Sequence, residues 1–149
     1  MANTRYLTMQ VEDHIRGVLS KRYGVQFQKL SLPLITGGSH EFDAVADDGS
    51  IVASVKSGSG KTSGGNIPSG KIDACIAELY FLTLVVASRR QLIFTTPDLH
   101  EIFVRKMQAK IVDGIEIVVS PLPTDIQAEV SRVQAVASAE VFPVLPPQT

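Results

Sequence analysis

Apolar residues recur at helical spacing at the start of the chain. Between residues 7 and 23, the positions that share one side of an α-helix are Leu7, Val11, Ile15, Val18 and Leu19. A stripe of this kind is typical of an amphipathic helix that packs on a core. We therefore predict that the chain opens with a helix over residues 7–23.

The next segments change to the alternation of β-strands. Residues 24–33 alternate briefly and end at a proline, and the runs 39–47 and 50–56 follow. Asp48 and Gly49 stand between the last two runs, and an Asp-Gly pair between apolar runs is typical of a hairpin turn. These patterns predict three strands, of which the last two are antiparallel.

Helical spacing returns over residues 69–88. The positions on its stripe are Ile72, Cys75, Ile76, Leu79, Thr83 and Val86. We predict a long, well-buried helix here, because the stripe is apolar along nearly all of its length.

The rest of the chain alternates between strand and helix. The predicted elements are a strand at 90–96, a helix at 97–110, a strand at 114–123 and a helix at 124–140. Thr96 before Pro97 is typical of a helix start, and Thr124 with Gln127 has the spacing of a capping box. The element order predicts one α/β domain over residues 1–140, followed by a flexible tail at 141–149.

Composition and charge limit the partners and the cellular location that can be expected for the protein. The 149 residues carry a net charge of −1, so any contact with nucleic acid needs a local basic patch. The lone Cys75 cannot form an internal disulfide, and within an apolar run it is expected to be packed rather than reactive. The longest apolar stretch, at 79–87, is shorter than a membrane span, and the first thirty residues lack the apolar core of a signal peptide. We predict a cytoplasmic protein without a membrane partner.

The letters GSGKT at residues 58–62 resemble the end of a phosphate-binding loop. Such a loop needs an earlier glycine, five residues before the Gly60 of Gly60-Lys61-Thr62, and a helix directly after it. The first position is held by Val55, and the residues after Thr62 have no helical pattern. The glycine- and serine-rich segment 57–70 instead predicts a mobile polar loop.

Asp43 and Lys56 are the most informative polar residues of the predicted hairpin. Asp43 lies within one strand and Lys56 ends the next, so the two side chains can reach one edge of the sheet. A carboxylate there can hold a divalent cation, and a lysine can position a water or stabilise charge on a phosphate. The alternative is a cross-strand salt bridge of little energetic value.

The motifs FDAV and VASVK, together with the element order, resemble the PD-(D/E)XK nuclease superfamily over residues 7–119. In that family a helix precedes three strands, the second strand carries an aspartate, and the third carries the (D/E)-x-K triplet. The resemblance implies a restriction-endonuclease-like, three-layer αβα domain around a five-stranded mixed sheet. It also implies that Asp43 binds Mg²⁺, with Mn²⁺ as a substitute, and that Lys56 is catalytic.

One position departs from the family pattern. Ser54 stands where the family usually has a carboxylate, and a hydroxyl is a weaker ligand for Mg²⁺. Some members with this serine take the acid from the following helix, and Glu78 is the candidate because it lies at the flank of the buried stripe. The alternative for Glu78 is an ordinary ion pair with Lys71, which lies near the same angular position.

Two further acids are candidate metal ligands. Glu12 on the first helix corresponds to an acid that some of these nucleases carry, whereas Arg16 offers it an ordinary surface ion pair. Glu41 is expected to share the face of Asp43. His40 is expected to lie on the opposite face, as a sheet-surface histidine.

Charge is divided sharply around these residues. Residues 32–53 contain four acids and no lysine or arginine, whereas residues 54–71 contain Lys56, Lys61 and Lys71 and no acid. An acidic cluster beside a basic loop is expected where a metal site meets a phosphate backbone, so Lys61 and Lys71 are candidate DNA-binding residues. The alternative is a surface loop that only aids solubility.

Two functions stay open from the sequence. One is a Mg²⁺-dependent nuclease that hydrolyses DNA through Asp43, Lys56 and Glu78. The other is a nuclease-like module that has lost its cation and serves in DNA binding or assembly. The helix at 124–140 is rich in small residues, so it serves either as an interface in a homodimer or with a partner protein, or as a cover for its own sheet.

Overall fold

The computed structural model describes residues 4–60 and 68–141, which form nine helices and strands in the predicted order. In chain order they are α1 (Thr4–Tyr23), β1 (Phe27–Pro33), β2 (Ser39–Ala46), β3 (Ile51–Lys56), α2 (Ser69–Leu84), β4 (Arg89–Phe94), α3 (Pro97–Lys106), β5 (Ile115–Val119) and α4 (Thr124–Val141).

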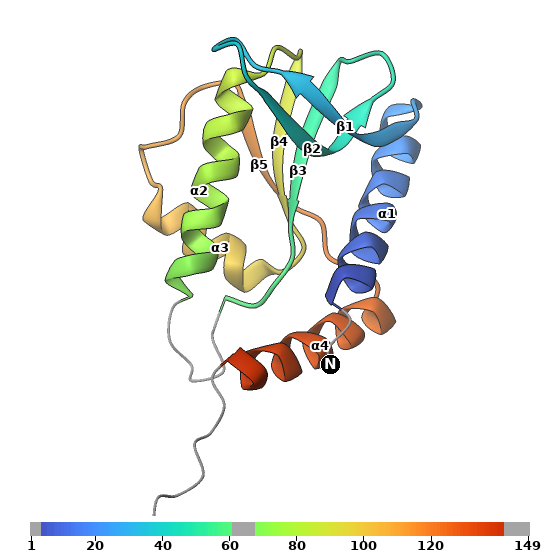
Figure 1. The fold of residues 1–149 in the computed structure, drawn as a ribbon, viewed down its shortest axis with the longest axis vertical. Coiled ribbons are helices and arrows are strands. Elements are labelled where there is room, and N and C mark those ends of the chain that lie inside the picture. The colour runs from blue at the N-terminus through green and yellow to red at the C-terminus, as the bar shows by residue number, and fades with distance from the viewer. Residues whose placement is uncertain (1–3, 61–67, 142–149) are drawn as a thin grey trace, which may run out of the picture.

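The five strands form one sheet in the order β1-β2-β3-β4-β5. β1, β2 and β3 pair antiparallel, whereas β3, β4 and β5 pair parallel. α2 and α3 cover one face of the sheet, and α1 lies on the other face with α4 packed against it (Figure 1). The predicted α/β class and mixed five-stranded sheet are therefore confirmed, and the layers are consistent with a three-layer domain.

Each face of the sheet has its own apolar core. α1 and α4 enclose one cluster, which includes Ile15 and Val130, and α2 and α3 enclose the other, which includes Ile72 and Phe103. Strand β3 contributes to both clusters, because its side chains alternate between the two faces. α4 thus packs on its own chain through the side that carries Val130.

The predicted apolar stripes are correct except near their ends. Val18 is 37% exposed, because it lies beside the stripe of α1 rather than on it. α2 ends at Leu84 instead of Ser88, since Val85 takes an extended conformation, and the chain therefore leaves Val86 81% exposed. Leu82, which the stripe did not include, is fully buried.

Two of the later elements end earlier than predicted, and the start of α4 lacks the predicted capping box. α3 ends at Lys106 rather than Lys110, because the chain turns there and Ala109 adopts a left-handed conformation with φ 61°. β5 ends at Val119, ahead of the proline-containing segment 120–123. The capping box is wrong: α4 already begins at Thr124, and the Gln127 side chain donates to Ser131 instead.

The β2–β3 hairpin has the turn that Asp48-Gly49 predicts. Gly49 has a φ of 73°, a region that glycine occupies without steric cost, and its N–H donates to the Ala46 carbonyl at 2.8 Å. The Asp48 carboxylate accepts the Ser50 N–H at 3.0 Å. These local bonds fix the connection between the two strands that carry the candidate site.

Residues 57–60, the start of the predicted mobile loop, are packed against α3. The Thr96 hydroxyl donates to the Gly58 carbonyl, and the Gly60 N–H donates to the Asp98 carboxylate at 2.8 Å. Gly58 and Gly60 are both buried. The prediction of mobility is therefore wrong for this part of the loop, and residues 61–67 lie outside the described residues.

Substituting Gly60 with alanine is expected to destabilise the protein by roughly 1–3 kcal/mol, because backbone would have to move. An added Cβ would lie 2.8 Å from the backbone carbon of Asp98 and 2.9 Å from the Cδ1 of Ile102. Urea denaturation measures the change. Gly70→Ala is the matched control, since nothing lies within 4 Å of its Cβ position, and equal stability of the two variants would contradict the prediction.

Candidate functional site

Asp43 lies where β2 and β3 stop pairing. The two strands pair at Ala44 with Ala53 and at Val45 with Val52. Next along the strands, the Oδ2 of Asp43 accepts the N–H of Val55 at 2.7 Å. The carboxylate thus takes the place of a main-chain acceptor, which satisfies a backbone donor at the point where the strands separate.

The environment of Asp43 opposes its negative charge. Burial, together with the nearby carboxylates of Glu12 and Glu78, raises the pKa of Asp43 to about 6, although the Val55 N–H and Lys29 act to lower it. A buried carboxylate among other acids gains from a bound cation, because the cation relieves both desolvation and repulsion. The electrostatics therefore favour cation binding at Asp43.

Glu78 reaches the same region from α2. Its Oε2 lies 3.1 Å from the Oγ of Ser54 and 3.0 Å from the Nε2 of His40. Ser54 is fully buried, so its hydroxyl donates to a carboxylate inside the protein. Glu78 therefore contacts the serine that lies two residues before Lys56, and it pairs with His40 rather than with Lys71.

Glu12 is buried instead of being at the surface. It is 7% exposed, and its carboxylate forms ion pairs with Lys29 at 3.1 Å and with Arg16 at 3.7 Å. The surface interpretation is therefore wrong, although the Arg16 partner is present. Arg16 also donates to the main-chain oxygen of Asp43 at 2.7 Å, which ties α1 to the candidate site.

Lys29 is a cation of the site that the sequence did not reveal. Its ammonium contacts Glu12 and lies 3.7 Å from Glu41, whose side chain is 60% exposed. The hydrogen bond to Glu12 raises the pKa of Lys29, and Asp43 contributes to the same shift. Glu12 and Glu41 thus already have a cation, and Glu41 is the more peripheral of the two.

His40 is not a surface histidine. Its half-buried ring stacks on Phe81 at 4.0 Å between centroids and meets the edge of Phe42 at 4.8 Å. His40 nevertheless lies on the face opposite Glu41, as alternation predicts, because Glu41 pairs with Lys29 beside Glu12 of α1 whereas His40 stacks on Phe81 of α2. The β1–β2 register shifts only after these residues, between the pairs of Phe42 and Val45.

The basic residues lie further along β3 and α2. Lys56 ends β3 opposite Phe94 and is half-buried, and Lys71 is exposed in the first turn of α2. Burial raises the pKa of Cys75 to about 11, while the charges of Lys56 and Lys71 work against that shift. The thiol is buried and protonated at neutral pH, which confirms that Cys75 is packed. Lys61 lies outside the described residues.

Asp43 and Glu78 are the two carboxylates that could share a cation, since the charge of Glu78 acts on Asp43. Within residues 4–60 and 68–141, no group of three or more His, Cys, Asp or Glu side chains has a metal-binding arrangement. Asp43 and Glu78 each use one oxygen for the contacts above, and each has a second carboxylate oxygen. Mg²⁺ commonly takes one or two protein carboxylates and completes its shell with water and substrate phosphates. The residues present are therefore compatible with Mg²⁺ or Mn²⁺.

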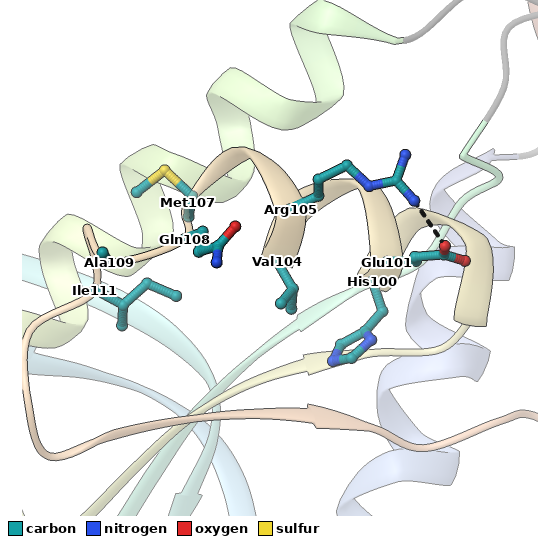
Figure 2. A pocket seen from close by; sticks show the side chains of 8 residues that line it. All are labelled: His100, Glu101, Val104, Arg105, Met107, Gln108, Ala109 and Ile111. Carbon is teal, nitrogen blue, oxygen red and sulfur yellow. Dashed lines mark hydrogen bonds and ion pairs between the residues drawn. The ribbon is translucent and has the colours of Figure 1, made fainter.

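A separate concave surface of about 640 Å³ runs along α3 and the segment after it. Figure 2 shows His100, Val104 and Ile111 beside this space, with an ion pair between Glu101 and Arg105 on the same helix. Its lining includes none of the candidate site residues, so it is a distinct feature of the surface.

Comparisons with protein-family models, with curated proteins and with solved structures find no match to this chain. Of the helices in the described part of the chain, none combines the length and apolar character needed to cross a membrane. The functional argument therefore depends on the residues around Asp43.

Proposed function

We propose that the protein is a metal-dependent nuclease with a restriction-endonuclease-like fold that hydrolyses phosphodiester bonds in DNA. The observation that carries the proposal is the contact of Glu78 with buried Ser54, two residues before Lys56. It supports the idea that α2 supplies the acid that β3 lacks. The raised pKa of Asp43 is a second support, since it indicates negative charge that a cation would stabilise.

Each residue has a role in this proposal. Asp43 and Glu78 would hold Mg²⁺ or Mn²⁺, which when bound supplies Lewis-acid stabilisation of the charge on the scissile phosphate. Lys56, at the end of β3, positions or deprotonates the attacking water. Glu12 and Glu41 are assigned to the outer part of the site, because Lys29 pairs with both. Lys61 and Lys71 would contact the DNA backbone.

Cleavage assays on single- and double-stranded DNA with Mg²⁺ or Mn²⁺ test the proposal. Asp43→Asn, Lys56→Ala and Glu78→Gln are each expected to lower the cleavage rate by about 100-fold, because each removes a group that acts at the reacting phosphate. Glu101→Gln is the matched control. Glu101 is also a helical glutamate in an ion pair, but it lies on α3, away from the candidate site. The cleavage rate of the Glu101→Gln variant is therefore expected to equal that of the wild type.

Absence of metal-dependent cleavage above the level of these variants would contradict the nuclease proposal. The second candidate, a DNA-binding or assembly module without catalysis, is favoured by one observation. The ammonium of Lys29 already neutralises Glu12 and lowers the pKa of Asp43, as a bound cation would. In that case DNA binding without cleavage is expected, weakened by salt and by Lys61→Ala or Lys71→Ala.

A further inference from the structure

The contact between His40 and Glu78 joins β2 to α2 beside the candidate site. The Nε2 of His40 lies 3.0 Å from the Oε2 of Glu78. This distance allows a hydrogen bond in which the Nε2–H of His40 donates to the carboxylate oxygen. The two side chains are about one-fifth exposed, which is low for a histidine and a glutamate at the edge of a sheet.

The imidazole of His40 is itself held in place by aromatic packing. Its ring is nearly parallel to that of Phe81, with an angle of 12°, and it meets the fully buried Phe42 at 79°. Stacked and edge-to-face rings prefer defined orientations. Packing against Phe42 on β2 and Phe81 on α2 therefore sets the direction of the Nε2–H independently of Glu78.

Glu78 needs such support, because a glutamate side chain has several rotatable bonds and loses much freedom when it is fixed. The contacts from His40 and from Ser54 go to the same oxygen of Glu78, Oε2. The two donors come from neighbouring strands. Together they fix the plane of the carboxylate and leave Oε1 as the oxygen available to a further partner.

We infer that His40 is a positioning residue that orients the carboxylate of Glu78 for the candidate cation site. The role in cation binding rests on the proposed function, whereas the orientation of Glu78 by His40 does not depend on a bound cation. His40 acts through Glu78 and does not touch the reacting groups. Outer partners of metal-binding side chains commonly change metal affinity by 10- to 100-fold when they are removed.

Two substitutions separate the hydrogen bond from the aromatic packing. His40→Phe keeps a ring against Phe81 and Phe42 but removes the donor, whereas His40→Gln keeps a donor and removes the ring. In calorimetric titrations with Mn²⁺ alone, His40→Phe is expected to lower the affinity by about tenfold. His40→Gln is expected to bind Mn²⁺ within about threefold of the wild type. Urea denaturation checks that both variants are folded.

Side-chain NMR on the metal-free protein gives a second readout that does not depend on a cation. The couplings of the Glu78 methylene groups are expected to show one rotamer in the wild type and in His40→Gln, and rotamer averaging in His40→Phe. The exposed Glu101 is an internal reference on another helix.

The outcomes distinguish this inference from the proposed function. If Glu78 is equally ordered in His40→Phe, or if His40→Gln is impaired as strongly as His40→Phe, the positioning role is wrong. If the wild type binds no Mn²⁺ while Glu78 loses its single rotamer only in His40→Phe, the positioning role stands and the metal-dependent nuclease proposal fails.

Discussion

Replacing Asp43 with asparagine is expected to raise the free energy of unfolding by roughly 2–3 kcal/mol at about pH 7.5. The reason is that burial and two neighbouring acids lift the pKa of this carboxyl from 3.8 to about 6, so the ionised form is costly in the folded state. Asparagine removes the charge and keeps an oxygen that can accept the Val55 N–H.

The pH dependence of this effect has a definite sign. Below the unfolded pKa of 3.8 both states are protonated, and the charge penalty is absent. Between 3.8 and about 6 the folded state binds more protons than the unfolded chain, so the free energy of unfolding falls as the pH rises. Urea denaturation is therefore expected to show that the difference in free energy of unfolding between Asp43→Asn and the wild type grows as the pH rises through this range. Above about pH 6 the difference is expected to stay constant.

Asp113→Asn is the control for this measurement, because Asp113 is exposed and its substitution is expected to leave stability nearly unchanged. A less stable Asp43→Asn variant would show that the bond to Val55 outweighs the charge penalty, and it would remove the electrostatic argument for a cation. If Asp43→Asn is more stable than the wild type, any loss of cleavage activity in this variant cannot be attributed to unfolding.

The sequence predicted the element order and the sheet because the signals involved are local. The apolar spacing of α1 and the Asp48-Gly49 turn depend on residues close together in the chain, and both agree with the structure. Helix ends were less predictable. The end of α2 at Leu84 is followed by an extended Val85 that packs in the core, and that contact depends on the fold as a whole.

The candidate site was predictable in its residue types but not in its contacts. The strand position of Asp43 and the core-flanking position of Glu78 follow from periodicity. The burial of Glu12 depends on Lys29, which is distant in sequence, and the burial of His40 depends on its stacking against Phe81 of α2. Alternation along β2 places His40 on the face opposite Glu41, but it does not show that α2 covers that face and brings Glu78 to the ring.

Ser54 connects the sequence argument to the structure. In the sequence Ser54 stands where the resemblance to the nuclease motif predicts an acid, whereas in the structure it is a fully buried residue in the middle of the sheet whose hydroxyl donates to Glu78. A small hydroxyl residue is the kind of side chain that fits between β3 and α2 while an acid from α2 occupies the space beside it. The serine and the helical glutamate are therefore best understood as one arrangement.

Restoring an acid on β3 through Ser54→Glu is consequently expected to destabilise the protein by about 4 kcal/mol or more, by overpacking the core and burying a second carboxylate beside Glu78. Ser54→Ala, the control, keeps the site small and loses only the hydrogen bond to Glu78, so a cost of about 1 kcal/mol is expected. Urea denaturation compares the two variants with the wild type.

The double substitution Ser54→Glu with Glu78→Ala separates the two causes of that loss. If repulsion between the carboxylates dominates, removing the acid on α2 is expected to recover about half of the stability, because the new carboxylate can then take the space that Glu78 held beside His40. If overpacking dominates, the double variant stays as unstable as Ser54→Glu. A Ser54→Glu variant that keeps wild-type stability and gains Mn²⁺ affinity would contradict both causes, since it would mean that β3 and α2 can each present an acid to one cation at the same time.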